Sequence, residues 1–307
     1  LLPLTGGYHM NLMKAESPGP SVSKLVPKVQ STAKILYTIY IILTIVEIIF
    51  LLIGKMPLFD TLCLSFGTAG TGGFGVKNDS IASYSTYNQV VITVFMILFG
   101  INFNAYYLLL TKKVMQAAKN EEVRYYLGII GLAIVAIAIN TREMFTSFGR
   151  AFQQAAFQVG SIITTDFNVW PVFSKTILVI LMFVGACAGS TGGGIKVSRL
   201  LILCKSARKE LQLYLHPNAV KKIKMDDKAI PHEVVRATNM FLFVYIMIFV
   251  TSLLIISLDN LDMVSNFTAI AATLNNIGPG LGAVGPTGNF NTYSYISKAV
   301  MIFDMLA

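Results

Sequence analysis

Long apolar runs are the feature that most restricts how this chain can fold. A helix that crosses a bilayer needs ~20 predominantly apolar residues. The runs that best meet this length are 35–53, 90–110 and 240–258. Weaker runs are 123–139, which is short, 172 to about 203, which glycines interrupt, and 296–307, which stops with the sequence. We therefore predict five membrane spans and a partial sixth.

Composition supports this interpretation. Only 13% of the 307 residues are charged and 54% are hydrophobic, whereas soluble domains have about 25% charged residues. The net charge of +9 does not indicate nucleic acid, because eighteen of the 24 Lys and Arg residues fall before residue 35, between 112 and 124, or between 196 and 236. Basic loops stay in the cytoplasm. We expect a multi-pass membrane protein with its basic loops in the cytoplasm, which contacts lipid and no nucleic acid.

Three segments between the apolar runs are too short or too polar to cross a bilayer. They are Leu58–Val76, Phe148–Val169 and Leu261–Gly282. Each begins with an apolar stretch that covers about half of the hydrocarbon core as helix. Backbone that re-enters at this depth must be buried in protein or line a water-filled cavity. The sequence thus predicts an all-α polytopic membrane protein, with helix, pore loop and helix repeated around a central pore, as in potassium channels.

The first of these segments contains a glycine pattern with two interpretations. Gly70, Gly72 and Gly75 fit the nucleotide-binding spacing G-x-G-x-x-G, but no strand precedes them and apolar runs flank them. Glycines also allow successive carbonyls to point the same way, as in a cation filter that replaces the hydration shell of an ion. We favour a filter, with a glycine-rich turn as the alternative.

A second glycine cluster interrupts the run from 172 to 203. Gly189, Gly194 and Lys196 approach the P-loop pattern, but Ile195 separates the last two. Five glycines fall between residues 185 and 194, and each disfavours helix by ~1 kcal/mol relative to alanine. We predict two half-helices around a loop that acts as a gate. Close glycine packing between helices is the alternative.

The chain resembles the Trk/Ktr/HKT superfamily of potassium transporters, most closely the bacterial TrkH type. The motifs that carry the resemblance are "MKAESPGP" (13–20), "SFGTAGTGGF" (65–74), "CAGSTGGGIKVSR" (187–199) and "TLNNIGPGLGAVGP" (273–286). In this family, four helix–pore loop–helix repeats surround one cation pathway, and each loop supplies backbone carbonyls around a central glycine. The resemblance implies K⁺ as the transported ion, no organic cofactor and no enzymatic activity. It also implies a location in the bacterial cytoplasmic (inner) membrane and a homodimer on a TrkA-like cytoplasmic nucleotide-binding regulatory subunit.

The resemblance also assigns residues to the site. The implied filter residues are Thr68, Gly70, Thr71, Gly72, Gly73, Thr164, Thr165, Asn275, Asn276, Ile277 and Gly278, with Gly72 and Gly278 as central glycines. The implied gate, an intramembrane loop that obstructs the pathway until the regulator moves it, comprises Gly189, Ser190, Thr191, Gly192, Gly193, Gly194 and Lys196.

The resemblance divides the chain into five parts. These are a cytoplasmic linker (1–34), a second repeat (35–112), a third repeat with the gate (113–204), a further cytoplasmic linker (205–235) and a fourth repeat cut in its last helix (236–307). The first repeat is absent, and about six filter residues are missing between Thr165 and Asp166. We expect segments of a longer protein, with a truly shortened product as the alternative.

Two other functions remain open at this stage. Broken helices also suit an ion-coupled secondary transporter. A membrane-embedded enzyme is less consistent with the sequence, because its three histidines and three cysteines are scattered and offer no nucleophile–base pair or metal-ligand spacing. Glu47, inside the first apolar run, is expected to face the protein interior, where it makes an interhelical hydrogen bond or relays protons.

Overall fold

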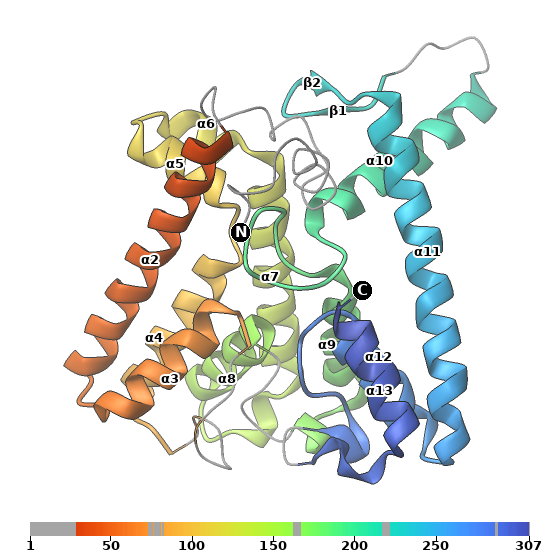
Figure 1. Cartoon of the computed structure of the whole chain (residues 1–307). Coiled ribbons are helices and arrows are strands. Elements are labelled where there is room, and N and C mark those ends of the chain that lie inside the picture. The colour runs from red at the N-terminus through yellow and green to blue at the C-terminus, as the bar shows by residue number, and fades with distance from the viewer. Residues whose placement is uncertain are drawn as a thin grey trace.

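The computed structural model describes residues 29–72, 76, 81, 83–161, 167–216, 222–285 and 288–306. Over these residues the chain is almost entirely helical. Within them, three helices are long and apolar enough to cross a membrane: α2 (Val29–Ile53), α7 (Glu121–Asn140) and α11 (His232–Ile256). They run between the upper and lower faces of the molecule in Figure 1. This confirms the predicted class of a helical membrane protein.

Three short helices occupy the predicted re-entrant segments. They are α3 (Leu58–Ala69), α8 (Phe148–Ser161) and α12 (Met263–Leu274). With 12 to 14 residues each, they extend only ~18 to 21 Å, about two thirds of the hydrocarbon core. The side chain of Asp262 caps α12 by accepting a hydrogen bond from the Ser265 amide at 2.9 Å.

The run 90–110, predicted as one span, is not a single helix. It forms α4 (Thr86–Phe99) and α5 (Phe103–Leu110), which are bent by 91° at residues 100–102. The side chain of Asn102 accepts a hydrogen bond from the Asn104 amide at 2.9 Å and so begins a new helix. An N-cap of this kind satisfies a free amide at a helix start, and the break therefore has a local cause as well as the tertiary one described below.

The run from 172 to 203 is broken where the glycines predict. Helix α9 (Val172–Val184) and helix α10 (Val197–Leu215) flank the interruption. Because α10 continues to Leu215, it extends past residue 204, where we placed the end of the third repeat. The remaining elements include helices α6 (Val114–Lys119) and α13 (Tyr295–Leu306) and the 3₁₀ turns η2 (Arg142–Met144), η3 (Phe167–Val169), η4 (Ser257–Asp259), η5 (Gly282–Val284) and η6 (Phe290–Thr292).

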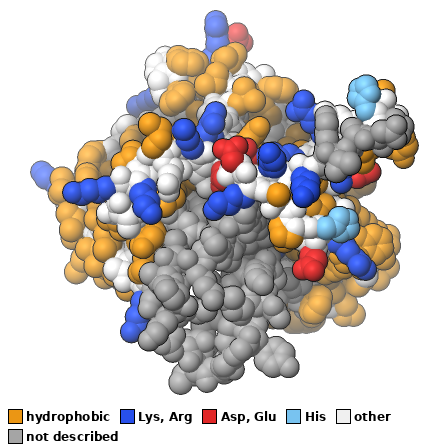
Figure 2. Space-filling model, turned by 90° about the horizontal axis from the view of Figure 1, so that it is seen from above, with side chains coloured by type: hydrophobic (Ala, Val, Ile, Leu, Met, Phe, Trp, Pro, Cys, Tyr) orange, Lys and Arg blue, Asp and Glu red, His pale blue; other side chains and the backbone are white. Residues whose placement is uncertain are grey.

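A short hairpin lies in the segment expected to be a linker. Strands β1 (Lys224–Met225) and β2 (Lys228–Ala229) pair antiparallel. Asp226 and Asp227 have φ of 49° and 61°, the positive values that a tight two-residue hairpin turn requires. Seen from above in Figure 2, Lys and Arg side chains gather on this face of the molecule.

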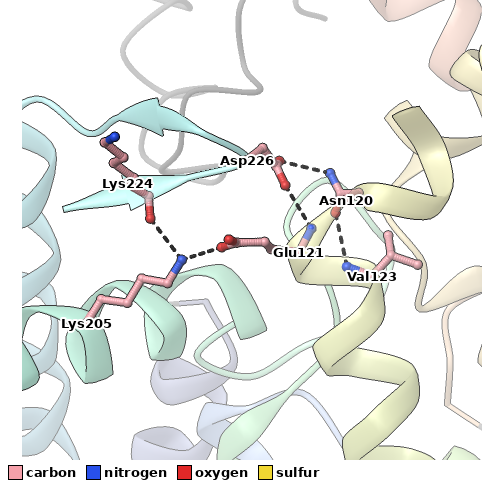
Figure 3. A network of polar contacts seen from close by, with 6 residues as sticks. All are labelled: Asn120, Glu121, Val123, Lys205, Lys224 and Asp226. Atoms are coloured by element: carbon pink, nitrogen blue, oxygen red, sulfur yellow. Dashed lines mark hydrogen bonds and ion pairs between the residues drawn. The ribbon is translucent and has the colours of Figure 1, made fainter. Parts of the chain in front are cut away.

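A polar network ties the hairpin to the start of α7 (Figure 3). Asp226 accepts hydrogen bonds from the Asn120 side chain at 3.2 Å and from the Glu121 amide at 2.8 Å. Asn120 in turn caps α7 by accepting from the Val123 amide at 3.0 Å. Lys205 of α10 pairs with Glu121 and donates to the Lys224 carbonyl at 2.8 Å. The first turn of α7 is therefore fixed against both α10 and the hairpin.

Candidate functional site

The short helices α3 and α12 end in the same backbone conformation. The amide of Thr71 donates to Thr68 O at 2.7 Å, and that of Asn276 donates to Thr273 O at 3.0 Å. One residue later, Gly72 donates to Gly67 O at 2.9 Å, and Ile277 donates to Ala272 O at 2.8 Å. Thr71 and Asn276 both have positive φ, 54° and 52°. This is the left-handed helix ending in which orphan carbonyls are satisfied from beyond the last turn.

This match sets the register between the two loops. Thr71 corresponds to Asn276, and Gly72 corresponds to Ile277 rather than to Gly278. Gly278 itself has φ of 116°, a conformation that side chains with a Cβ disfavour. Gly73, which occupies the matching place in the first loop, lies outside the described residues, as do Thr164 and Thr165.

Buried polar side chains brace both helix ends. The hydroxyl of Thr68, which is 1% exposed, donates to Leu64 O at 2.8 Å. Asn275, also 1% exposed, donates to Ala271 O at 2.8 Å and accepts from the Tyr245 hydroxyl of α11 at 2.9 Å. Their side-chain hydrogen bonds go back into the protein, so these residues fix the backbone that follows them.

The interruption 185–196, which we name the glycine loop, closes on itself. The amide of Ala186 donates to Gly193 O at 3.3 Å, and that of Val197 donates to Ala186 O at 3.0 Å. A Cβ added at Gly194, where φ is 83°, would lie only 2.6 Å from the Cα of Gly185. The two ends of the loop can therefore cross this closely only because both are glycines.

The glycine loop also pairs with the break between α4 and α5. The amides of Cys187 and Thr191 donate to Gly100 O at 3.0 Å and to Phe99 O at 3.5 Å. In the opposite direction, the amide of Phe103 donates to Gly189 O at 3.2 Å. Two stretches of non-helical backbone thus satisfy one another inside the protein, which is where such backbone is tolerated at membrane depth.

The glycine loop lies directly against the ends of α3 and α12. A Cβ added at Gly193 would be 1.8 Å from the carbonyl oxygen of Asn275, and one added at Gly192 would be 3.5 Å from the hydroxyl of Thr71. A cavity of about 90 Å³ lies between them. Its lining includes Thr71, Asn276 and Ile277 from the helix ends and Gly185, Ala186, Gly192 and Gly193 from the loop.

Two helix ends place negative partial charge beside this cavity. The carboxyl ends of α3 and α12, which line it, carry the partial negative charge of a helix dipole, about half an elementary charge each. The carbonyls of the last helical turns are themselves satisfied by the amides of Thr71, Gly72, Asn276 and Ile277, so any carbonyls that replace the hydration shell of an ion must come from the residues that follow. Lys196, with φ of 74°, turns back, and its ammonium group donates to Gly192 O, a residue that also lines the cavity. The remaining predicted gate residue, Ser190, donates to Cys187 O at 2.6 Å within the loop.

Glu47 faces the protein interior, as expected for an acidic residue in a span. It is fully buried, and neither carboxyl oxygen makes a hydrogen bond to the described residues. The side chain of Thr68, at the end of α3, is the polar group beside it. The position of Glu47 of α2 beside Thr68 of α3 fits the expected interhelical contact, and the proton-relay interpretation stays a prediction.

Two buried polar residues of this region were not anticipated from the sequence. Asn102 and Glu122 are 3% and 1% exposed, and the side-chain NH₂ group of Asn102 donates to the carboxylate of Glu122 at 3.1 Å. Glu122 also accepts from two backbone amides near the glycine loop. In the sequence, Glu122 has the form of an ordinary acidic residue in the first turn of a helix, and only its proximity to the loop in three dimensions distinguishes it.

The fold and this site define a class: a helical membrane protein in which short helices end at a small cavity beside an interrupted helix. The chain belongs to the TrkH family, described as cation transport proteins, whose model matches residues 1–307. That family is one of transporters and not of enzymes. The family assignment agrees with the resemblance drawn from the four sequence motifs.

Individual relatives give the same result. The chain is 34% identical to "Trk system potassium uptake protein TrkH" of Salmonella typhimurium and 37% identical to the protein of that name from Vibrio parahaemolyticus. Each match covers 100% of this chain and 65% of the relative, so the chain spans about two thirds of their length. The crystal structure of the potassium transporter TrkH from Vibrio parahaemolyticus matches with a TM-score of 0.83 and 33% identity, over 97% of this chain and 66% of that one.

Proposed function

We propose that this chain forms the greater part of a potassium uptake protein, in which carbonyls beyond α3 and α12 select the ion and the glycine loop gates its path. One observation carries the proposal: Gly193 of the loop lies against the carbonyl oxygen of Asn275, where the filter begins. A cation leaving the filter toward the basic face would meet the loop at once. The names of the relatives, which are potassium uptake proteins, supply the identity of the ion.

The register of the helix ends refines the filter. Because Gly72 corresponds to Ile277, we propose Gly73 as the partner of Gly278 in the ring of carbonyls, in place of Gly72. Thr68, Gly70 and Thr71 then hold the backbone of the second-repeat loop in position, as Asn275 and Asn276 do for the fourth-repeat loop. Thr164 and Thr165 stay predictions for the third repeat, and the complete protein supplies the rest of the ring.

The remaining parts of the proposal concern assembly and orientation. The face that carries α10 and the hairpin is rich in Lys and Arg (Figure 2), which supports a cytoplasmic position in the inner membrane of a bacterium. It is continuous with the glycine loop through α10, so a TrkA-like nucleotide-binding subunit docked there could control the gate. Two copies of the protein would form a homodimer.

Selectivity in the full-length protein tests the filter. Purified protein is reconstituted into liposomes, and K⁺ and Na⁺ uptake is compared for wild type, Gly278→Ser, Gly73→Ser and Gly72→Ser. A side chain at the φ of Gly278 adds strain of ~1 to 3 kcal/mol and displaces a carbonyl. Gly278→Ser and Gly73→Ser should therefore reduce the preference for K⁺ more than Gly72→Ser does. Unchanged selectivity in the first two variants would contradict the filter assignment.

The same preparation separates the proposal from ion-coupled transport. A gated pathway passes K⁺ down its electrochemical gradient, driven by ~2.3 kcal/mol per charge per 100 mV of membrane potential. A secondary transporter, which the 91° break between α4 and α5 would also suit, requires a gradient of H⁺ or Na⁺. K⁺ uptake that stops when both of those gradients are removed, at constant potential, would favour the transporter.

A further inference from the structure

Glu122 is the acidic side chain at which the glycine loop, α7 and α10 meet. One carboxylate oxygen accepts from the amide of Ala188, in the loop, at 2.6 Å and from the amide of Ser198, in the first turn of α10, at 3.2 Å. The other oxygen accepts from the Asn102 side chain at 3.1 Å. Ala188, Ser198 and Asn102 are at most 4% exposed, so this arrangement is closed to bulk water.

Each of these donors needs the carboxylate. The Ser198 amide is one of the amides at a helix start that have no partner within the helix, and a negative charge there also complements the helix dipole. The Ala188 amide belongs to irregular backbone, where an unpaired buried donor is costly. Asn102 uses its own oxygen to cap α5, so its NH₂ group must find a separate acceptor.

We propose that Glu122 is the positioning residue that holds the glycine loop against the ends of α3 and α12, where the proposed filter begins. It links three backbone ends through one side chain: the loop at Ala188, the start of α10 at Ser198 and the start of α5 at Asn102. Removing the carboxylate leaves the loop held by its backbone hydrogen bonds and by the Thr191 hydroxyl, which donates to Phe99 O at 3.3 Å. This inference rests on the proposed function, because it assigns to Glu122 a role in the proposed gating by the glycine loop.

The neighbouring residue Glu121 provides a matched control. It lies in the same turn of α7 but points away from the loop, toward Lys205 and the hairpin (Figure 3). Both members of that ion pair are partly exposed, at 28% and 32%. Such pairs contribute little to stability. Glu121→Gln therefore removes one carboxylate from this turn at little cost in stability, and it leaves the hydrogen-bond donors of the loop paired.

A native cysteine reports the position of the loop independently of transport. Cys187 is fully buried and lies next to Ala188. Its alkylation by N-ethylmaleimide in the purified full-length protein is followed by mass spectrometry of its own peptide, so that the exposed Cys63 and Cys204 do not interfere. Because charge-assisted hydrogen bonds are lost, Glu122→Ala should speed this alkylation at least about tenfold, and Glu121→Gln should leave it unchanged.

Exchange of donor and acceptor provides the sharper test. In Glu122→Gln, the new NH₂ group faces the NH₂ group of Asn102, so one hydrogen bond is lost and alkylation should accelerate. In the double variant Asn102→Asp with Glu122→Gln, the aspartate accepts from the glutamine and can still cap α5. Alkylation should return to within about twofold of wild type, a rescue that packing volume alone does not explain.

Potassium flux measured alongside separates the two proposals. Fast alkylation with raised basal flux in Glu122→Ala supports both the positioning role and the gate. Fast alkylation with unchanged flux keeps the positioning role and refutes the loop as gate. Alkylation at the wild-type rate in Glu122→Ala overturns the positioning role. If that variant does not fold, wild-type alkylation in Glu122→Gln, or no rescue in the double variant, overturns it equally.

Discussion

Replacing Gly193 with alanine tests the contact between the glycine loop and the filter. The added methyl group would lie 1.8 Å from the Asn275 carbonyl oxygen and 2.9 Å from its carbonyl carbon. Side-chain carbons normally keep ~3.5 Å from other atoms, so the two backbones must separate by about 1.7 Å. Asn275 is held by Tyr245 and by its own helix, whereas the loop is irregular. We expect the loop to move.

The size of the effect follows from this overlap. Overpacking by one methyl group in a tight interior costs ~1 to 3 kcal/mol. The strain applies only to the closed arrangement, since an open loop no longer touches Asn275. A bias of ~1 to 3 kcal/mol between two states changes their ratio by about 5- to 150-fold. Basal K⁺ flux of the full-length Gly193→Ala variant should therefore rise by about an order of magnitude, with selectivity kept.

The assay is K⁺ uptake into liposomes at fixed potential, without any regulatory subunit. Gly131→Ala is the matched control, because a Cβ at Gly131 of α7 meets nothing within 4 Å. Both variants are first checked for folding by thermal unfolding. Wild-type flux in a folded Gly193→Ala protein would refute the closed-loop interpretation, and loss of K⁺ selectivity would show that the filter moved instead.

Three further outcomes are expected. Gly131→Ala should stabilise the protein by ~0.5 to 1 kcal/mol, measured by unfolding, because it only improves helix propensity. Asp262→Ala should lower the free energy of unfolding by ~1 kcal/mol through loss of the α12 cap. Hydrogen bonds from Ser265 lower the pKa of Asp262. The stability difference between wild type and variant should therefore be complete above the unfolded pKa of ~3.9 and disappear as pH falls through the lower folded pKa. Deleting residues 192–194 should raise basal flux whether or not the regulatory subunit is present; absent flux in folded protein would contradict the gate.

The short helices and the glycine loop could be predicted because their causes are local. Helix α12 follows from an apolar stretch too short to cross a bilayer and from Asp262 as its cap. The break between α9 and α10 follows from the low helix propensity of five glycines. In both cases the residues that cause the feature also form it, so the feature can be predicted from the sequence alone.

The break between α4 and α5 has causes that lie elsewhere in the chain. Residues 90–110 are as apolar as a continuous span, and Asn102 in it could equally have been an ordinary helix residue. The break is stabilised by hydrogen bonds from Cys187 and Thr191, more than 80 residues away. Glu122 is similar, because its role depends on Ala188 and Ser198. Neither could be located before the fold was known.

These two unanticipated features explain why the predicted loop is well defined. A glycine-rich interruption alone would be a flexible segment with many conformations. Here its buried amides are satisfied by carbonyls at the α4–α5 break and by the carboxylate of Glu122. The break supplies neutral backbone partners, which hold the shape of the loop, whereas Glu122 supplies an acidic acceptor. A gate needs a closed state that is ordered but separable, and a single carboxylate on a neighbouring helix provides a contact that can be lost without unfolding either helix.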